Sequence, residues 1–137
     1  MDAVTFGLAV AAYGSLALDA AMGVKRVLSI PTAVVAVTHV VLVWHGRFHW
    51  SLATATTRGW AGFIVFHSAL ALIVAAAAAP GRWAERCVYT AFPVVTVGAV
   101  SAVFRYDWVA AWRWPVVAIA ALGATALVRR LSLRRKV

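Results

Sequence analysis

The stretch from Thr38 to Ser68 reads THVVLVWHGRFHWSLATATTRGWAGFIVFHS and is rich in histidine and tryptophan, in a chain otherwise made mostly of Ala, Val, Leu and Gly. It begins inside one apolar run, crosses the longest polar connection and ends inside the next apolar run. Two apolar runs separated in this way indicate two antiparallel helices that are neighbours in space. The stretch contains three of the seven tryptophans and all four histidines, namely His39, His45, His49 and His67.

The composition of the whole chain indicates a membrane protein. Of its 137 residues, 64% are hydrophobic and only 12% are charged, whereas a soluble domain carries about 25% charged residues. A globule of this size has too little interior to hide so much apolar surface from water. We therefore expect an all-α integral membrane protein, located in a prokaryotic cytoplasmic membrane.

Five apolar runs follow one another, each close to the roughly 20 residues that a spanning helix needs. They cover residues 3–22, 29–46, 60–79, 87–104 and 108–128. The fifth run is the weakest, because its unbroken apolar part covers only residues 115–128, and four spans with this run in the interface are the alternative. The runs predict a single domain, a bundle of about five transmembrane helices with no room for a soluble domain.

The basic residues are shared unequally between the two ends of this bundle. Nine fall at one end and four at the other: Lys25, Arg26, Arg82, Arg86, Arg129, Arg130, Arg134, Arg135 and Lys136, against Arg47, Arg58, Arg105 and Arg113. Because cytoplasmic loops carry the excess of Lys and Arg, we expect the C-terminus in the cytoplasm and the N-terminus outside. Basic residues in short clusters between apolar runs indicate contact with anionic lipid and argue against nucleic acid as a partner.

Six of the seven tryptophans fall at the expected outer end: Trp44, Trp50, Trp60, Trp108, Trp112 and Trp114. An aromatic belt at the membrane interface explains tryptophans without any partner. The excess on one side is more than a belt requires, so we also expect a surface there for other membrane subunits.

His39 and His67 are expected at one depth in neighbouring helices. Each is seven residues from the outer end of its run, which places it roughly 10 Å deep at 1.5 Å per residue. Two histidines placed in this way predict axial ligation of haem b or another tetrapyrrole, with Arg47 and Arg58 available to pair with its propionates. The alternative is that each imidazole simply bonds a backbone carbonyl, Thr38 or Ser68.

A second candidate site lies in the outer connection. His45 and His49 are four residues apart and share a face if the second helix continues past Gly46. That spacing can hold a metal ion, with Asp107 or Asp2 as a third ligand. The alternative is two interfacial histidines in an aromatic belt.

Asp19 is the only acid inside a predicted span. An intramembrane carboxyl group can serve a proton or ion pathway; the alternative is a pair with Lys25, Arg26 or another arginine of the same end. Cys87 is the only cysteine, which excludes an internal disulfide and a cysteine-based metal cluster.

Three functions remain from this reasoning. The first is a non-catalytic accessory or anchor subunit of a larger membrane complex, of redox type if the tetrapyrrole is bound. The second is a small oligomeric transporter or channel. The third is a membrane enzyme that uses the outer His and Asp residues as a metal site.

Overall fold

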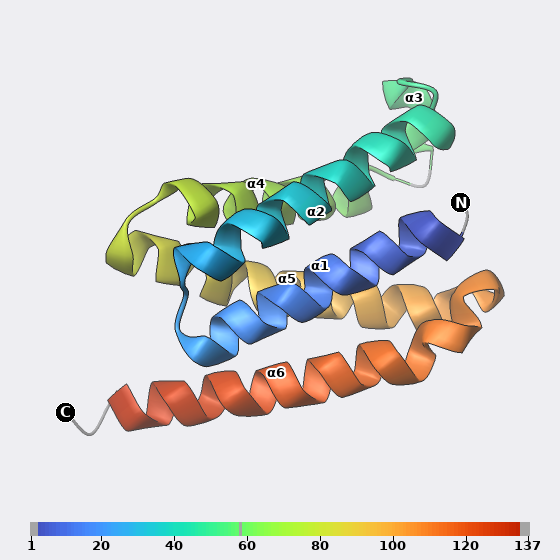
Figure 1. Ribbon diagram of the computed structural model, residues 1–137. Helices are drawn as coiled ribbons and strands as arrows, with labels where there is room; N and C mark the ends of the chain where they lie inside the picture. Colours follow the sequence, from blue (N-terminus) through green and yellow to red (C-terminus); the bar gives the residue numbers. More distant parts are fainter. Residues whose placement is uncertain (1–2, 58, 135–137) are drawn as a thin grey trace.

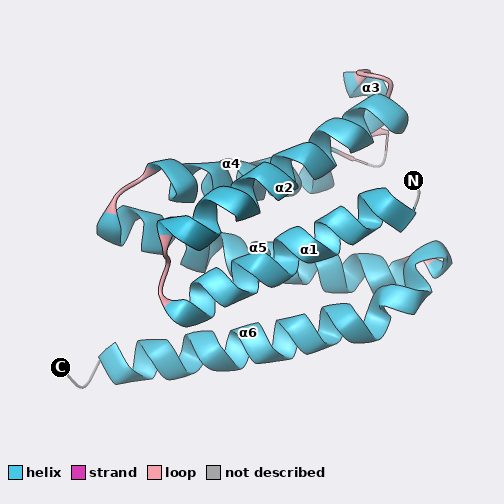
Figure 2. Ribbon diagram, in the orientation of Figure 1, coloured by secondary structure: helices cyan, strands magenta, loops and turns pink. Residues whose placement is uncertain are grey.

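The chain folds into helices joined by short turns (Figure 2). The computed structural model describes residues 3–57 and 59–134, and this part of the chain contains no strand. The elements in chain order are α1 (Ala3–Met22), α2 (Arg26–Gly46), α3 (Leu52–Thr56), α4 (Trp60–Ala78), α5 (Gly81–Arg105), the 3-10 helix η1 (Asp107–Trp112) and α6 (Arg113–Arg134). Five segments are long and apolar enough to cross a membrane: α1, α2, α4, α5 and η1 with α6. The predicted all-α class and the five long apolar helices are confirmed.

The long helices run alternately between two ends of the molecule (Figure 1). The start of α1, the short helix α3 and η1 lie at one end, which we call the aromatic end. The α1–α2 turn, the α4–α5 turn and the end of α6 lie at the other, which we call the basic end. Arg58, Arg135, Lys136 and Asp2 lie outside the described residues.

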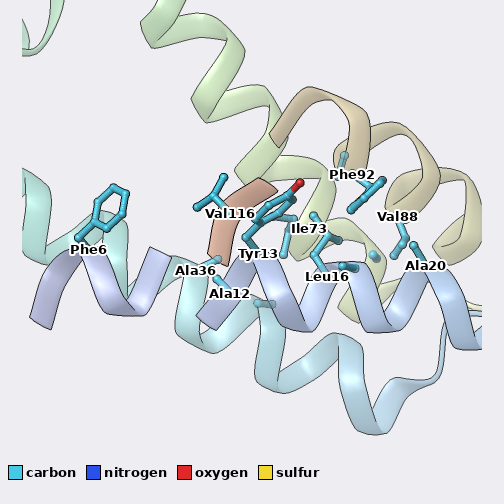
Figure 3. Close-up of a cluster of buried hydrophobic side chains, with 14 of the residues drawn as sticks. Phe6, Ala12, Tyr13, Leu16, Ala20, Ala36, Ile73, Val88, Phe92 and Val116 are labelled. Carbon is cyan, nitrogen blue, oxygen red and sulfur yellow. The ribbon is translucent and has the colours of Figure 1, made fainter. Parts of the chain in front are cut away.

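Helices α1 and α5 form the centre of the bundle. Helix α1 packs against α2, α5 and α6, while α5 also packs against α4 and α6. Tyr13 of α1 stacks on Phe92 of α5, with ring centroids 5.9 Å apart, and donates a hydrogen bond of 2.8 Å to Thr96 (Figure 3). Gly123 of α6 lies against the Phe92 ring, where a Cβ atom would be only 2.4 Å from Cζ.

Polar contacts tie α1 to α2 at three levels. Asp19 accepts hydrogen bonds from the Ser29 hydroxyl and, at 2.9 Å, from the Lys25 backbone N–H. Thr32 donates to Ser15 at 2.7 Å in the middle of the pair. Near the aromatic end a third contact joins a histidine of α2 to the α1 backbone. Because lipid offers helices little hydrophobic attraction for one another, such contacts and close packing hold spanning helices together.

Several helices are longer than the apolar runs that predict them. Helix α2 begins at Arg26, three residues before the apolar run at 29–46, and Ser29 lies inside it as a buried residue that bonds Asp19. Helix α5 begins at Gly81, six residues before the apolar run at 87–104. Polar residues continue a helix as readily as apolar ones where no breaker intervenes, so an apolar run understates the length of its helix.

The fifth run differs most from its prediction of one helix over 108–128. Residues 107–112 form the separate turn η1, and α6 then continues to Arg134. Pro115 accounts for the break, because a proline lacks the N–H that a helix interior needs and is tolerated in the first turn. Arg129, Arg130 and Arg134 belong to α6 at the basic end.

Candidate functional site

The candidate tetrapyrrole ligands lie on α2 and α4, as predicted, but each imidazole already has hydrogen-bond partners. His39 Nδ1 lies 2.7 Å from the carbonyl oxygen of Thr5 on α1. His67 Nδ1 lies 2.8 Å from the carbonyl oxygen of Phe63, one turn earlier in α4. A carbonyl oxygen can only accept, so both rings carry their proton on Nδ1.

The other ring nitrogen of His67 is also engaged. The indole N–H of Trp44 donates to His67 Nε2 at 3.2 Å, which fits the tautomer because an indole can only donate. The Phe63 ring stacks on the imidazole, with centroids 4.0 Å apart. His67 therefore joins α2 to α4 through a hydrogen bond and a ring stack, close to the aromatic end.

Trp44 is the centre of a larger cluster, which we call the Trp44 cluster. Its ring contacts Phe48, Trp50, Phe63 and His67, with centroids 5.8 to 6.2 Å apart. Phe48 and Trp50 of the cluster belong to the turn after α2, in which His49 and Trp50 have φ values of 47° and 58°. Positive φ is uncommon for residues other than glycine and costs free energy. That strain is offset by contacts such as the stack of Trp50 on Trp44.

A second aromatic group, around Phe6, fixes the turn η1. Phe6 of α1 contacts Trp108 and Trp112, each at a centroid distance of 5.8 Å. Arg113 donates to the carbonyl oxygen of Val103 at 2.8 Å and pairs with Asp107 at 3.5 Å. The predicted outer end of the bundle thus holds two aromatic groups, one on α2, the turn after it and α4, and one on α1 and η1.

This arrangement meets one condition for tetrapyrrole ligation and leaves another unmet. A ligating histidine usually donates one ring N–H to a carbonyl and binds the metal through the other nitrogen, and both imidazoles are held in that tautomer. The Nε2 atom of His67, however, is occupied by Trp44. Iron could bind there only if the indole moved away. Of the arginines predicted to pair with propionates, Arg47 follows the end of α2, and Arg58 lies outside the described residues.

The residues of the predicted metal site are not brought together. Helix α2 ends at Gly46, so His49 lies in the following turn, and the condition for a shared helical face with His45 is not met. Asp107 is exposed and pairs with Arg113. Within residues 3–57 and 59–134, no group of three or more His, Cys, Asp or Glu side chains could hold a metal ion.

Asp19 is fully buried and stabilises the α1–α2 turn. Its partners are the Lys25 N–H and the Ser29 hydroxyl, rather than the side chain of a basic residue as the simpler prediction had it. Its own carbonyl oxygen accepts from the backbone N–H groups of Gly23 and Val24, which ends α1. One residue thus terminates α1 and caps the start of α2.

The sequence analysis did not predict the contacts of two residues: the bond of Trp44 to His67 and the contacts of Arg130 beside the α1–α2 turn. A buried indole N–H needs an acceptor, so Trp44 could have been paired with a histidine at similar depth. Arg130 of α6 donates to the Tyr89 hydroxyl at 3.0 Å and lies 4.0 Å from Glu85. Its guanidinium group also covers Gly23, where a Cβ atom would be 1.8 Å from Nη2.

Comparisons with known proteins give no further guide to these sites. No protein-family model, curated protein or solved structure matches the chain, so its function is inferred from its own residues.

Proposed function

We propose that the chain is a five-span membrane protein that serves as an accessory or anchor subunit of a larger membrane complex. It is oriented with its basic end in the cytoplasm and its aromatic end outside, because among the described residues the basic end carries seven basic residues and the aromatic end three, and cytoplasmic loops carry that excess.

This proposal rests on the hydrogen bonds made by the polar groups in the interior of the bundle. Among the described residues, every buried polar side-chain atom has a hydrogen-bond partner within the bundle. Asp19 and the buried Thr32 both join α1 to α2. In transporters and channels, intramembrane polar groups serve the substrate or ion pathway. Here they hold helices together, which favours a protein that acts through its surface.

The surface offers a candidate interface at the aromatic end. Trp50, Trp60, Trp108 and Trp114 are all more than half exposed, and Trp114 reaches 80%. Tryptophans are enriched where proteins bind one another. The strained turn that holds Trp50 supports the same interpretation, because backbone strain tends to persist where it serves a function.

Site-specific photocrosslinking tests the subunit role. We expect benzoylphenylalanine at position 50 or 114 to trap a defined second polypeptide in native membranes. The matched control is Val97 of α5, which is 68% exposed but lies within a spanning helix and should trap lipid. Equal yields from all three positions, or only copies of the chain itself, would contradict a subunit that docks through its aromatic end.

Binding of a tetrapyrrole by His39 and His67 stays a prediction within this proposal. Its support is the shared tautomer of the two imidazoles. Ligation predicts a six-coordinate low-spin spectrum in the purified complex, lost in His39→Ala and in His67→Ala but kept in His45→Ala. Trp44→Phe should preserve or strengthen the spectrum, because it removes the donor that competes for His67 Nε2. A complete complex without a Soret band would exclude haem.

A further inference from the structure

We propose that a groove between α1 and α6 at the basic end binds one anionic phospholipid, with the lipid phosphate at Arg129. The groove is open on one side and has a volume of about 580 Å³. Its lining includes Ala21 of α1 and Ala121, Leu122, Thr125, Arg129 and Arg130 of α6. Helices α1 and α6 lie side by side here (Figure 1).

The floor of the groove suits an acyl chain. Ala21, Ala121 and Leu122 present only methyl and isobutyl groups. The Thr125 hydroxyl donates to the carbonyl oxygen of Ala121 at 2.8 Å, so the polar group of this residue is satisfied within its own helix. A hydrocarbon chain can lie on such a surface without covering an unpaired polar group.

The two arginines at the end of the groove differ in what they offer a ligand. Arg130 is held by Tyr89 and Glu85, and that acid offsets part of its charge. Arg129 is exposed, and its side chain has no ion-pair partner among the described residues. A guanidinium group binds phosphate oxygens through two parallel hydrogen bonds. Arg129 is therefore the residue available for a phosphate, and Arg130 supports it from a fixed position.

The charge of this end selects an anionic lipid over a zwitterionic one. Seven basic residues of the described part of the chain lie at this end, and basic residues near a membrane surface attract anionic lipid. The acids of this end, Asp19 and Glu85, both have partners within the bundle. The apolar floor below Arg129 favours a lipid over free phosphate, because phosphate gains nothing from it. This inference rests on membrane insertion with the basic end at the cytoplasmic leaflet and is independent of the subunit role.

Native mass spectrometry of the purified chain in mild detergent, titrated with phosphatidylglycerol, tests the site. We expect one tightly bound lipid per chain and about ten-fold weaker binding in Arg129→Gln, because the charge-assisted hydrogen bonds from Arg129 to the phosphate are lost. Arg82→Gln removes the same charge from the exposed start of α5 and should leave this first binding step unchanged.

A second pair of variants tests the apolar floor without changing the charge. Ala121→Phe fills the groove and should abolish tight binding, whereas Ala124→Phe, on an exposed and different face of α6, should not. Phosphatidylcholine should bind weakly, and excess inorganic phosphate should not displace the lipid. Equal loss in Arg129→Gln and Arg82→Gln, equal binding of the two lipids, or displacement by phosphate would each overturn the proposal. Failure of this test leaves the crosslinking result at the aromatic end unaffected.

Discussion

Substitutions of Asp19 distinguish a structural role of its carboxyl group from a role in proton transfer. In Asp19→Ala, the Lys25 N–H loses its acceptor and the Ser29 hydroxyl loses a buried partner. An N–H bond to a charged acceptor contributes about 1.5–3 kcal/mol, and a side-chain contact between membrane helices about 0.6–1.7 kcal/mol. The sum predicts a loss of about 3 kcal/mol, or roughly 10 °C in Tm for a chain of this size.

Asp19→Asn is the informative partner of that variant. The amide oxygen can still accept from the Lys25 N–H, and the amide N–H₂ can donate to Ser29. The Ser29 hydroxyl can then donate to the carbonyl oxygen of Lys25, 3.2 Å away. We therefore expect Asp19→Asn to cost less than about 1 kcal/mol, because both contacts persist as neutral hydrogen bonds.

Thermal unfolding in detergent, followed by tryptophan fluorescence, measures both variants. A wild-type Tm in Asp19→Ala would refute the structural role. If Asp19→Asn lowered Tm as much as Asp19→Ala, the charge would matter rather than the hydrogen-bond geometry. A stable Asp19→Asn protein that lost its activity in the cell would instead support a role of Asp19 in a proton or ion pathway.

Two further predictions use substitutions with matched controls. Gly123→Ala should lower the free energy of unfolding by about 1–3 kcal/mol, because its Cβ atom would meet the packed Phe92 ring. The control is Gly62→Ala in α4, whose Cβ atom meets no atom within 4 Å and which should be neutral or stabilising. Unfolding curves that coincide for the two variants would contradict the described packing. The orientation can be tested with single cysteines in a chain that lacks Cys87. A membrane-impermeant maleimide applied to intact cells should label Thr57→Cys at the aromatic end and should not label Ser132→Cys near the end of α6. The reverse pattern would show that the orientation is the opposite of the proposed one.

The sequence was sufficient for the helices whose ends carry strong signals. Helix α1 covers residues 3–22 as predicted, and α4 ends just before Pro80-Gly81, where proline and glycine stop a helix. The starts of α2 and α5 were placed too late, because the basic residues before each apolar run belong to the helix. The short helix α3 was not predicted either. Its start is capped by Ser51, whose hydroxyl accepts from the Thr54 N–H.

The sequence predicted the helices that carry the candidate site but not the directions in which its side chains point. His39 and His67 lie on the expected helices, yet His39 contacts α1 rather than α4. A spanning helix that is apolar all round gives little sign of which face meets a neighbour, so its rotation depends on packing that the sequence pattern does not reveal. The acceptor for Trp44 and the position of Arg130 over Gly23 depend on the same rotations.

The most direct test of the central claim is the native mass of the tagged protein extracted from its own membrane in mild detergent. A subunit should emerge in a discrete complex with at least one other polypeptide at fixed stoichiometry. The substitution Trp114→Ala should dissociate that complex without unfolding the chain, since this side chain is 80% exposed. A chain that leaves the membrane alone, as a monomer or as an assembly of identical copies, would contradict the claim.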